Sequence, residues 1–406
     1  MIRVRPFRAW RPAPHTAHLV GSRSFLTYTP EQLREKLAGN PYSFLHIVHA
    51  DHDRAGLTRA EHFDAVRRKF DEFTQEGFLQ REEKPAFYLY EQSCAIFTSM
   101  GLIGAVSVAD YDEGRVKVHE QTLTAREEIF TEYLEHTGIN AEPVLLAVPG
   151  PPDLEKRLAE LAKGNTLYDF CTTDRIRHRF WKVDAPSEID ALVGHFKQLD
   201  ALYIADGHHR SASSARLAMT TGAQGEDPKA WCLAYMVPQT QLHIFNFDRV
   251  VSGLNGHSPA SFLEALGKTG RLTALPNGPE RCAPAGHVQV RTQVGWHLLE
   301  LPKTAGANVT EALDASMLSS AVLGPLLGIA DLRTDPRIRF IPGTDPMAAL
   351  DKLVDTGKVD VAFNLCAVPF ESLAAVADAR GMMPPKTTWV EPKLRSGLTI
   401  YSLKDN

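Results

Sequence analysis

Five consecutive residues, Asp-Gly-His-His-Arg at positions 206–210, have the types and spacing of an anion-binding turn. An apolar stretch at 202–205, expected to be a strand, precedes them, and a small-residue stretch at 211–220 is expected to be a helix. Gly207 permits a tight turn and a close backbone approach to a ligand. The amide groups that follow would lie at a helix N-terminus, where the dipole favours an anion, and Arg210 adds a fork suited to phosphate. The segment predicts a site for phosphate or carboxylate.

The other side chains of this segment leave alternatives open. His208 and His209 add hydrogen-bond donors, and Asp206 could hold a divalent cation or anchor the turn. The structural alternative is a turn in which Asp206 caps the helix and both histidines are ordinary. Zinc is disfavoured because two adjacent histidines lack the usual ligand spacing and no cysteine lies close in sequence.

A second candidate is the stretch Val-His-Glu-Gln at 118–121, which precedes an expected helix after Thr122 or Thr124. Glu120 could act as a general base, which requires a carboxylate within hydrogen-bond reach of a substrate hydroxyl. A single glutamate before a helix is more often a cap or a solvated charge.

A third candidate lies near the C-terminus, where two prolines at 384–385 stiffen an extended segment. This segment presents Lys386 and the hydroxyls of Thr387 and Thr388, groups that suit phosphate or carboxylate. The alternative is an ordinary edge strand with an exposed lysine.

The surrounding pattern is that of a mixed α/β protein. Helices are expected to start at the cap-like Thr29-Pro30 pair, at Thr58 with Glu61 in capping-box spacing, and at Asp153. Strands are expected at 86–90, 103–108 and 144–148. Residues 252–285 are rich in Gly, Pro and Asn and are interpreted as a linker. Beyond it we expect a separate α/β unit, with Asp345 capping a helix and a strand at 359–365.

Composition excludes several classes of protein. The 406 residues carry a formal charge of −5, which argues against a nucleic-acid-coating protein. Five scattered cysteines without a C-x-x-C pair favour reduced thiols, most of them expected to be buried. No signal peptide and no run of about 18 apolar residues is found, so we expect a cytoplasmic protein without a membrane span.

The candidate motifs occur together in one family, and the chain resembles the DUF1015 proteins, which are related to archaeal free-serine kinases. The resemblance runs nearly end to end. It rests on Arg-Pro-Phe-Arg at 5–8, Gly-Leu-Ile-Gly at 101–104, His-Glu-Gln-Thr at 119–122, the 206–210 segment, Met-Pro-Pro-Lys-Thr-Thr at 383–388 and Glu-Pro-Lys at 391–393. The smaller kinase is similar at the His-Glu-Gln, Asp-Gly-His-His-Arg and Pro-Lys-Thr-Thr motifs.

The resemblance implies a fold. The nucleotide-binding core would look like the ParB/sulfiredoxin fold and would span 111–250, completed by the tail at 383–406. An N-terminal α/β region at 1–110 and a smaller C-terminal α/β domain at 286–382 would flank it.

The resemblance also implies a function: a kinase that transfers a phosphoryl group from ATP or ADP to free L-serine or a similar small hydroxyl compound, with Mg²⁺ neutralising charge. The partners would be the nucleotide and a small-molecule substrate. The implied roles are Glu120 as general base, His209 as a second catalytic group, Asp206, Gly207, His208, His209 and Arg210 as phosphate-binding residues, Asp206 as metal ligand, and His119, Lys386, Thr387 and Thr388 as substrate-binding residues.

Departures from the family pattern bear on the acceptor. Asp248 stands where members commonly place histidine, Ser211 stands where an aromatic residue is frequent, and Ser-Phe-Leu-Thr at 24–27 replaces a Pro-Tyr-Asp-Val segment. The acceptor therefore need not be serine. The alternatives are a ParB-like nucleotide-binding switch without kinase activity and a phosphate-binding hydrolase.

Overall fold

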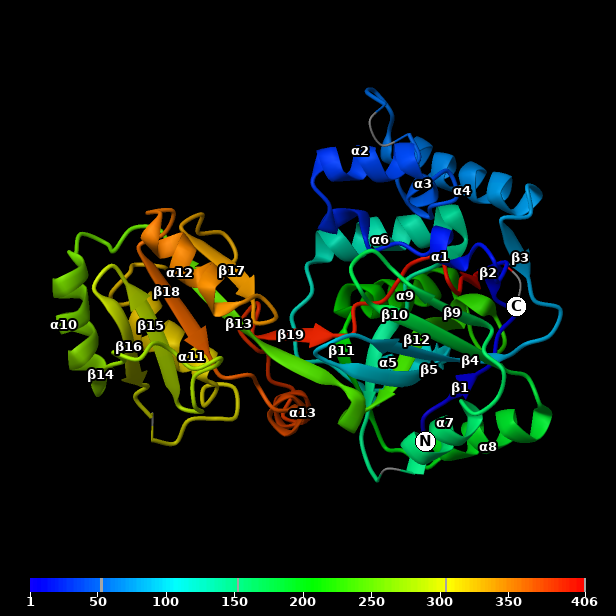
Figure 1. Cartoon of the computed structure of the whole chain (residues 1–406). Coiled ribbons are helices and arrows are strands. Elements are labelled where there is room, and N and C mark those ends of the chain that lie inside the picture. Colours follow the sequence, from blue (N-terminus) through cyan, green and yellow to red (C-terminus); the bar gives the residue numbers. More distant parts are fainter. Residues whose placement is uncertain (52–53, 152, 304, 405–406) are drawn as a thin grey trace. The chain divides into compact units, whose positions relative to one another are not determined.

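The computed structural model describes residues 1–51, 54–151, 153–303 and 305–404. Its contacts divide the chain into two compact units (Figure 1). The first unit contains residues 1–117, 122–243 and 392–406, and the second contains 118–121 and 244–391. Each unit is built on its own β-sheet, so the mixed α/β class expected from the sequence is confirmed.

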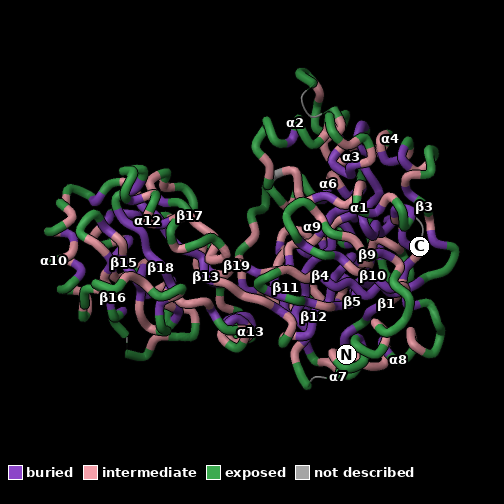
Figure 2. The backbone as a smooth tube through the Cα atoms, viewed as in Figure 1, coloured by how far each residue is buried: buried purple, intermediate pink, exposed green. Residues whose placement is uncertain are grey.

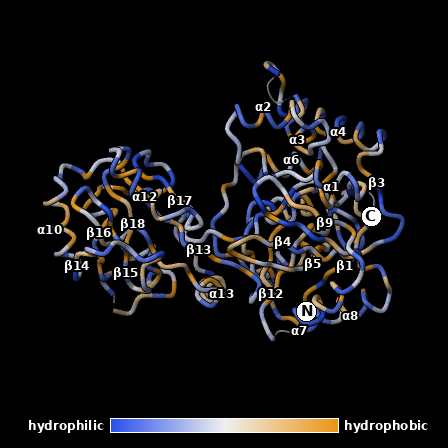
Figure 3. Tube along the Cα trace, viewed as in Figure 1, coloured by the Kyte–Doolittle hydropathy of each residue, from blue (hydrophilic) through white to orange (hydrophobic). Residues whose placement is uncertain are grey.

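The first unit is centred on a mixed sheet in the order β6-β11-β8-β12-β5-β4-β10-β9, with β1 paired to β5. The β11–β6 and β12–β8 pairs are parallel, and the other pairs are antiparallel. Its strands are β1 Val4–Arg5, β4 Phe87–Ser93, β5 Thr98–Ser107, β6 Val116–Lys117, β8 Val144–Val148, β9 Tyr168–Cys171, β10 Arg177–Val183, β11 Leu202–Asp206 and β12 Trp231–Pro238. In Figure 2 this sheet is mostly buried, and in Figure 3 many of the same segments are hydrophobic.

Helices cover both faces of this sheet, with α6 and α9 on one side and α7 and α8 on the other (Figure 1). The small pairs β2 Trp10–Pro12 with β3 Leu79–Arg81, and β7 Ile139–Asn140 with β20 Tyr401–Ser402, complete the unit. The helices are α1 Ala17–Val20, η1 Phe25–Thr27, α2 Pro30–Gly39, α3 Leu45–Val48, α4 Arg59–Gln75, α5 Val108–Asp112, α6 Thr124–Thr137, α7 Asp153–Leu161, α8 Pro186–Lys197, α9 His208–Thr221, η2 Pro228–Ala230 and η3 Gln239–Gln241.

Local sequence explains why the N-terminal helices form where they do. Thr29 and Thr58 each close a capping box, in which the threonine hydroxyl and a side chain three residues later satisfy end amide groups. The apolar side chains of Val66, Phe70 and Phe73 on α4 are buried against α3, β3 and the chain near β7. The helix starts at Thr29 and Thr58, the helix from Asp153, and strand 144–148 are all confirmed.

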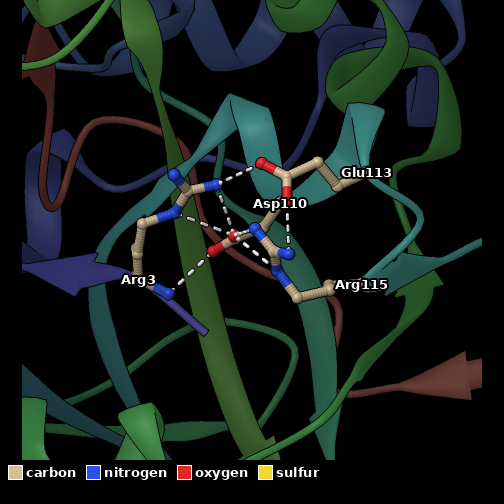
Figure 4. Close-up of polar contacts among 4 residues, drawn as sticks. All are labelled: Arg3, Asp110, Glu113 and Arg115. Carbon is tan, nitrogen blue, oxygen red and sulfur yellow. Dashed lines mark hydrogen bonds and ion pairs between the residues drawn. The ribbon is translucent and has the colours of Figure 1, made fainter. Parts of the chain in front are cut away.

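A buried carboxylate connects the N-terminus to the sheet (Figure 4). Asp110, which has no exposed side-chain surface, accepts hydrogen bonds from the backbone amide of Arg3 at 2.7 Å and from the guanidinium groups of Arg3 and Arg115 at 2.8 to 3.0 Å. Glu113 pairs with the same two arginines. These contacts hold together β1, α5 and β6.

The second unit has a sheet in the order β14-β16-β15-β18-β13-β17, with β19 paired to β13. Alternate residues of its strands face two different cores: Val251 and Phe363 pack with α10 and η4, whereas Val250 and Ala362 pack with α12. The elements are β13 His243–Val251, β14 Leu272–Ala274, β15 His287–Thr292, β16 Gly295–Glu300, β17 Ile338–Pro342, β18 Val361–Leu365 and β19 Thr388–Glu391, with α10 Pro259–Thr269, α11 Asp314–Leu318, η4 Ser319–Leu323, α12 Met347–Asp355 and α13 Phe370–Asp378.

The interpretation of residues 252–285 as a linker is wrong. The segment contains α10 and β14, and Phe262 and Leu266 of α10 are fully buried. Its Gly, Pro and Asn residues flank the helix, whose start is a capping box at Ser258. The N-cap position of α12 is Pro346 and not the expected Asp345. The expectation that most cysteines are buried is also wrong, because only Cys232 is buried among the described residues.

The predicted domain limits at 110, 250, 286 and 382 stay predictions. In the structure residues 1–117 and 122–243 share a unit because β5 pairs with both β4 and β12. Within the described residues, no helix has the length and apolar character needed to cross a membrane.

Candidate functional site

The 206–210 segment forms a tight turn from a strand into a helix in the first unit. β11 ends at Asp206, α9 begins at His208, and Gly207 between them has a φ of 100°. A Cβ at Gly207 would lie 3.0 Å from Nε of Arg210, so both backbone conformation and space favour glycine. The first amide groups of α9 have no intrahelical acceptor, and the helix dipole adds partial positive charge there. The expected strand, turn and helix are therefore present, and anion binding at this turn stays a prediction.

Arg210 holds this turn rather than extending away from it. Its Nη2 donates to Oδ2 of Asp206 at 2.8 Å, and its Nη1 donates to the carbonyl oxygen of Pro143 at 2.6 Å. The same Nη1 lies 3.5 Å from the carboxylate of Glu142. The guanidinium thus joins the end of β11 to the loop before β8.

Lys393 completes the charges around the turn. Its Nζ lies 3.4 Å from Oδ1 of Asp206, so the aspartate faces a cation on each oxygen. Burial alone would raise the pKa of Asp206, but Lys393 and then Arg210 lower it to about 2. Burial would likewise lower the pKa of Arg210, but Glu142 and Asp206 raise it. Asp206 and Arg210 are therefore both charged at neutral pH.

The two histidines of the turn differ. His208 is buried, whereas His209 is half-buried near the start of α6. Burial, followed by the charge of Arg126, lowers the pKa of His209, so its ring is neutral at pH 7. Within the described chain, the buried Nδ1 of His209 has no hydrogen-bond partner. A buried ring nitrogen without a hydrogen-bond partner is uncommon, so the Nδ1 of His209 is an unusual feature of this turn.

The residues predicted to bind the acceptor substrate come from the His-Glu-Gln and Pro-Lys-Thr-Thr motifs, and they belong to the second unit. The amide of Met383 donates to the carbonyl oxygen of His119 at 2.8 Å, so the His-Glu-Gln and Pro-Lys-Thr-Thr segments are brought together. His119 is buried, and burial lowers its pKa to about 4, which leaves the ring neutral at pH 7. Glu120 is half-buried.

Lys386 stands on an unusual backbone conformation, with a φ of 57°. It is exposed, and its Nζ lies 5.5 Å from the centre of the Phe247 ring. Thr387 is buried, and its hydroxyl donates to the carbonyl oxygen of Pro384 at 2.7 Å. Thr388 is half-buried and begins β19. Lys386 is thus the accessible cation of this segment, while the Thr387 hydroxyl shapes it.

The structure places two further cationic side chains beside the candidate motifs, and the sequence alone did not indicate either of them. Lys393 was noted only within the Glu-Pro-Lys motif, yet it lies beside Asp206. Arg249 is fully buried, and its Nη2 donates to the carbonyl oxygen of Lys386 at 3.3 Å. Burial lowers the pKa of Arg249 to about 10, so it is charged at neutral pH. The only available signal for Arg249 was its place after the unusual Asp248.

A resident metal ion does not fit the turn as it stands. Among the described residues, no group of three or more His, Cys, Asp or Glu side chains could hold a metal. Both oxygens of Asp206 face cations, which compete with a metal for the same lone pairs. The prediction that Asp206 binds Mg²⁺ therefore lacks geometric support.

Comparison with protein families identifies the group to which the chain belongs. A family model described as "Protein of unknown function (DUF1015)" matches residues 4–316. This is a DUF1015 protein. The matched range includes the His-Glu-Gln and Asp-Gly-His-His-Arg motifs and ends before the Pro-Lys-Thr-Thr motif.

Among solved structures, this DUF1015 protein is similar to a free serine kinase in complex with AMP, with 15% identity and a TM-score of 0.39 over 74% of this chain and 91% of that one. A C-terminally truncated SbnI from Staphylococcus aureus gives 13% identity and a TM-score of 0.41 over 74% and 88%. A conserved hypothetical protein from Pyrococcus furiosus gives 14% and 0.37 over 75% and 96%. No curated protein matches the chain.

Proposed function

We propose that this DUF1015 protein is a phosphotransferase that moves a phosphoryl group from ATP or ADP to free L-serine or a similar small hydroxyl compound in the cytoplasm. The observation that carries the proposal is the 206–210 turn, where the N-terminus of α9 follows directly on Asp206, Lys393 lies 3.4 Å from that aspartate, and the ring of His209 is neutral. Helix N-termini with adjacent cations bind nucleotide phosphates in many enzymes.

On the donor side, the amide groups at 208–210 would bind phosphate oxygens, and Lys393 would add a charge-assisted contact. His209, whose side chain is half-buried, would hydrogen-bond to the phosphate through its ring. Arg210 would act mainly by holding the turn, because three protein oxygens already surround its guanidinium. Asp206 would orient both cations. Phosphoryl transfer depends chiefly on such positioning and charge stabilisation.

On the acceptor side, Glu120 would take the proton from the acceptor hydroxyl as that oxygen attacks the terminal phosphorus. The bond from phosphorus to the bridging oxygen would break, and the nucleotide would leave with one phosphate fewer. Lys386 would bind the carboxylate of the amino acid, while His119, Thr387 and Thr388 would shape its site. These assignments rest on the motif resemblance and on the hydrogen bond that joins 119 to 383.

Mg²⁺ would enter with the nucleotide phosphates and would supply charge neutralisation there, since magnesium sites in kinases use phosphate oxygens and water with few carboxylates. Binding, orientation and proton acceptance would come from the protein's own groups.

The test is to incubate the protein with Mg²⁺, free L-serine and either ATP or ADP, and to measure O-phosphoserine by mass spectrometry. We expect product with the wild type, at least a 100-fold loss with Glu120→Gln, as a general base typically contributes about 10²- to 10⁴-fold, and a loss of nucleotide affinity with His209→Ala. Glu128→Gln, on the exposed face of α6, is the matched control.

Nucleotide binding without product, lost only in His209→Ala, would contradict transfer to serine. It would favour another acceptor or the alternative of a ParB-like nucleotide-binding switch. Absence of both binding and product would overturn the proposal for the 206–210 turn.

A further inference from the structure

Two cysteines of the second unit belong to none of the candidate motifs. Cys282 lies in the loop between β14 and β15, and Cys366 directly follows β18. Both are half-buried, so a small reagent can reach them. They are far apart in the sequence, and only the fold of the second unit can bring their thiols together.

The side chain of Asn364 in β18 fastens the loop that carries Cys282. Its Oδ1 accepts a hydrogen bond from the backbone amide of Ala283 at 3.0 Å, and its Nδ2 donates to the carbonyl oxygen of Arg281 at 3.4 Å. The backbone on both sides of Cys282 therefore lies against this one carboxamide. Gln289 of β15 donates to the same Oδ1 at 2.8 Å, which holds the carboxamide in place.

Cys366 comes two residues after Asn364, directly behind the last residue of β18. Residues two apart along a strand point to the same side of the sheet and lie about 7 Å apart. The Cys366 thiol is therefore on the side where Asn364 holds the loop with Cys282. The electrostatics agree with this placement: burial, then the charges of Asp314 and Cys282, raise the pKa of Cys366. Charges shift a pKa in this way at short range, so the two thiols are neighbours.

We propose that Cys282 and Cys366 are a reversible oxidation site, at which a low-molecular-weight disulfide converts the two thiols into a disulfide bond between the loop and the end of β18. The Cys282 thiolate attacks one sulfur of the reagent, the reagent's S–S bond breaks, and one thiolate leaves. The Cys366 thiolate then attacks the Cys282 sulfur and displaces the second thiolate. Two protein thiols are oxidised, the reagent is reduced to two thiols, and these take up the two protons that the cysteines release.

The environment of Cys366 determines the order of these steps. Its raised pKa keeps it protonated at neutral pH, and only a thiolate attacks a disulfide, so the first attack comes from Cys282. In the mixed disulfide Cys282 carries no charge, and its repulsion of a Cys366 thiolate is gone. Cys366 then ionises more readily and completes the bond.

The alternatives fit less well. A metal ion bound by the two thiolates lacks further ligands, because no group of three or more His, Cys, Asp or Glu side chains among the described residues could hold one. Two inert structural thiols would be expected to be buried, and neither of these is. The inference goes beyond the proposed phosphotransfer and does not depend on it, because neither cysteine belongs to the motifs that carry that proposal.

The test exposes the folded full chain to oxidised glutathione, blocks the remaining thiols by alkylation and maps the digested peptides by mass spectrometry. We expect a peptide pair joined through Cys282 and Cys366, which dithiothreitol separates. Cys232 is buried and should stay reduced, which shows that the chain remained folded. Cys171→Ser is the matched control: Cys171 is exposed and lies in the first unit, so its loss should leave the joined pair unchanged.

Two further measurements bear on the mechanism. In Cys366→Ser the reagent should remain attached to Cys282 as a mixed disulfide, because the thiol that would displace it is gone. Oxidation should raise the melting temperature of the second unit in the wild type by roughly 4 °C or more, since the bond restricts the unfolded chain, and should not raise it in Cys366→Ser.

Three outcomes would overturn the inference. The first is glutathione attached separately to Cys282 and Cys366 in the wild type without a joined pair. The second is a pair of thiols that stays reduced, and the third is a joined pair that leaves the melting temperature of the second unit unchanged. Phosphoserine formation enters none of these measurements, so a failure of the proposed function would remain distinct.

Discussion

The two cations at the 206–210 turn have different tasks at the scale of single residues. Arg210 is surrounded by three protein oxygens, one of them at 2.6 Å and one at 2.8 Å, whereas the Nζ of Lys393 lies 3.4 Å from the carboxylate of Asp206. Exchanging a contact of that length for a closer one to a phosphate oxygen costs less than breaking the short bonds of Arg210. Lys393 should therefore supply more of the binding energy for nucleotide than Arg210 does.

We expect Lys393→Met to raise the Kd for ATP by about tenfold, since a charge-assisted hydrogen bond contributes roughly 1.5–3 kcal/mol. The dependence of Kd on salt should also weaken. Lys163→Met is the matched control, because Lys163 is exposed and pairs only with Glu160 in the described structure. Calorimetry at two salt concentrations measures both effects; an unchanged Kd would exclude Lys393 from the site.

Asp248 gives a prediction about stability and pH. Burial raises its pKa from 3.8 to about 6, although Asn364 and Asn246 donate to it. Because the folded protein holds this proton more tightly than the unfolded chain, the group's contribution is fully present below pH 3.8 and is lost as pH rises through 6. The loss amounts to about 3 kcal/mol.

Asp248→Asn keeps the shape and an accepting oxygen but carries no charge at any pH. We expect its free energy of unfolding to exceed that of the wild type by up to about 3 kcal/mol above pH 6 and to differ little near pH 4. Urea unfolding across this range measures the difference. The exposed Asp355→Asn should show no such trend, and a pH-independent effect of Asp248→Asn would contradict the assignment.

At the scale of elements, the sequence predicted those with strong local signals. The capping boxes at Thr29 and Thr58 and the continuous apolar run of β8 determine structure within a few residues. It failed at α10, where Gly, Pro and Asn on both sides suggested a linker. What fixes α10 is the burial of Phe262 against strands distant in sequence, which local composition does not reveal.

The contacts of Asp110 have consequences for the elements they join. Its carboxylate receives hydrogen bonds from Arg3 of the N-terminal segment and from Arg115 before β6, so it fixes both to α5 (Figure 4). Removing the carboxylate breaks hydrogen bonds that involve a charged group, at a cost of about 1.5–3 kcal/mol, while water can reach the partly exposed guanidinium groups that remain.

Asp110→Ala should therefore lower the free energy of unfolding by about 1.5–3 kcal/mol, measured by urea denaturation. Asp153→Ala is the comparison, because Asp153 is exposed and its ion pair with Lys156 is 3.7 Å long. That variant should change stability by less than about 1 kcal/mol. Equal effects of the two substitutions would show that the buried contacts of Asp110 contribute no more to the free energy of unfolding than an exposed ion pair does.

At the scale of the whole molecule, the sequence showed which motifs the chain contains but not which compact unit each of them belongs to. Local patterns cannot show that residues 118–121 join the second unit, nor that residues 392–406 return to the first. Both follow from contacts between residues far apart in the chain, such as β20 with β7 and Ile400 with Trp10. Such pairings carry no signal in a single sequence, which is why Lys393 was not assigned to the turn.

The returning tail leads to a prediction for the first unit as a whole. Its apolar side chains at Leu398, Ile400, Tyr401 and Leu403 are at most 4% exposed. At about 1.5–3 kcal/mol for each buried side chain, the tail contributes an upper estimate of roughly 6–12 kcal/mol. That is comparable to the entire stability of a typical domain, about 5–15 kcal/mol.

A chain that ends at Glu391 should therefore lose the cooperative unfolding of its first unit and its ATP binding together. The second unit, whose cores contain no residue of the tail, should keep its own transition. Calorimetric melting of both chains would show one transition missing, and Lys393→Met in the full chain is the control that loses affinity without losing the transition. If the truncated chain kept the melting transition of the first unit, the tail would be an accessory segment, and the stability of that unit would have to come from its sheet and helices alone.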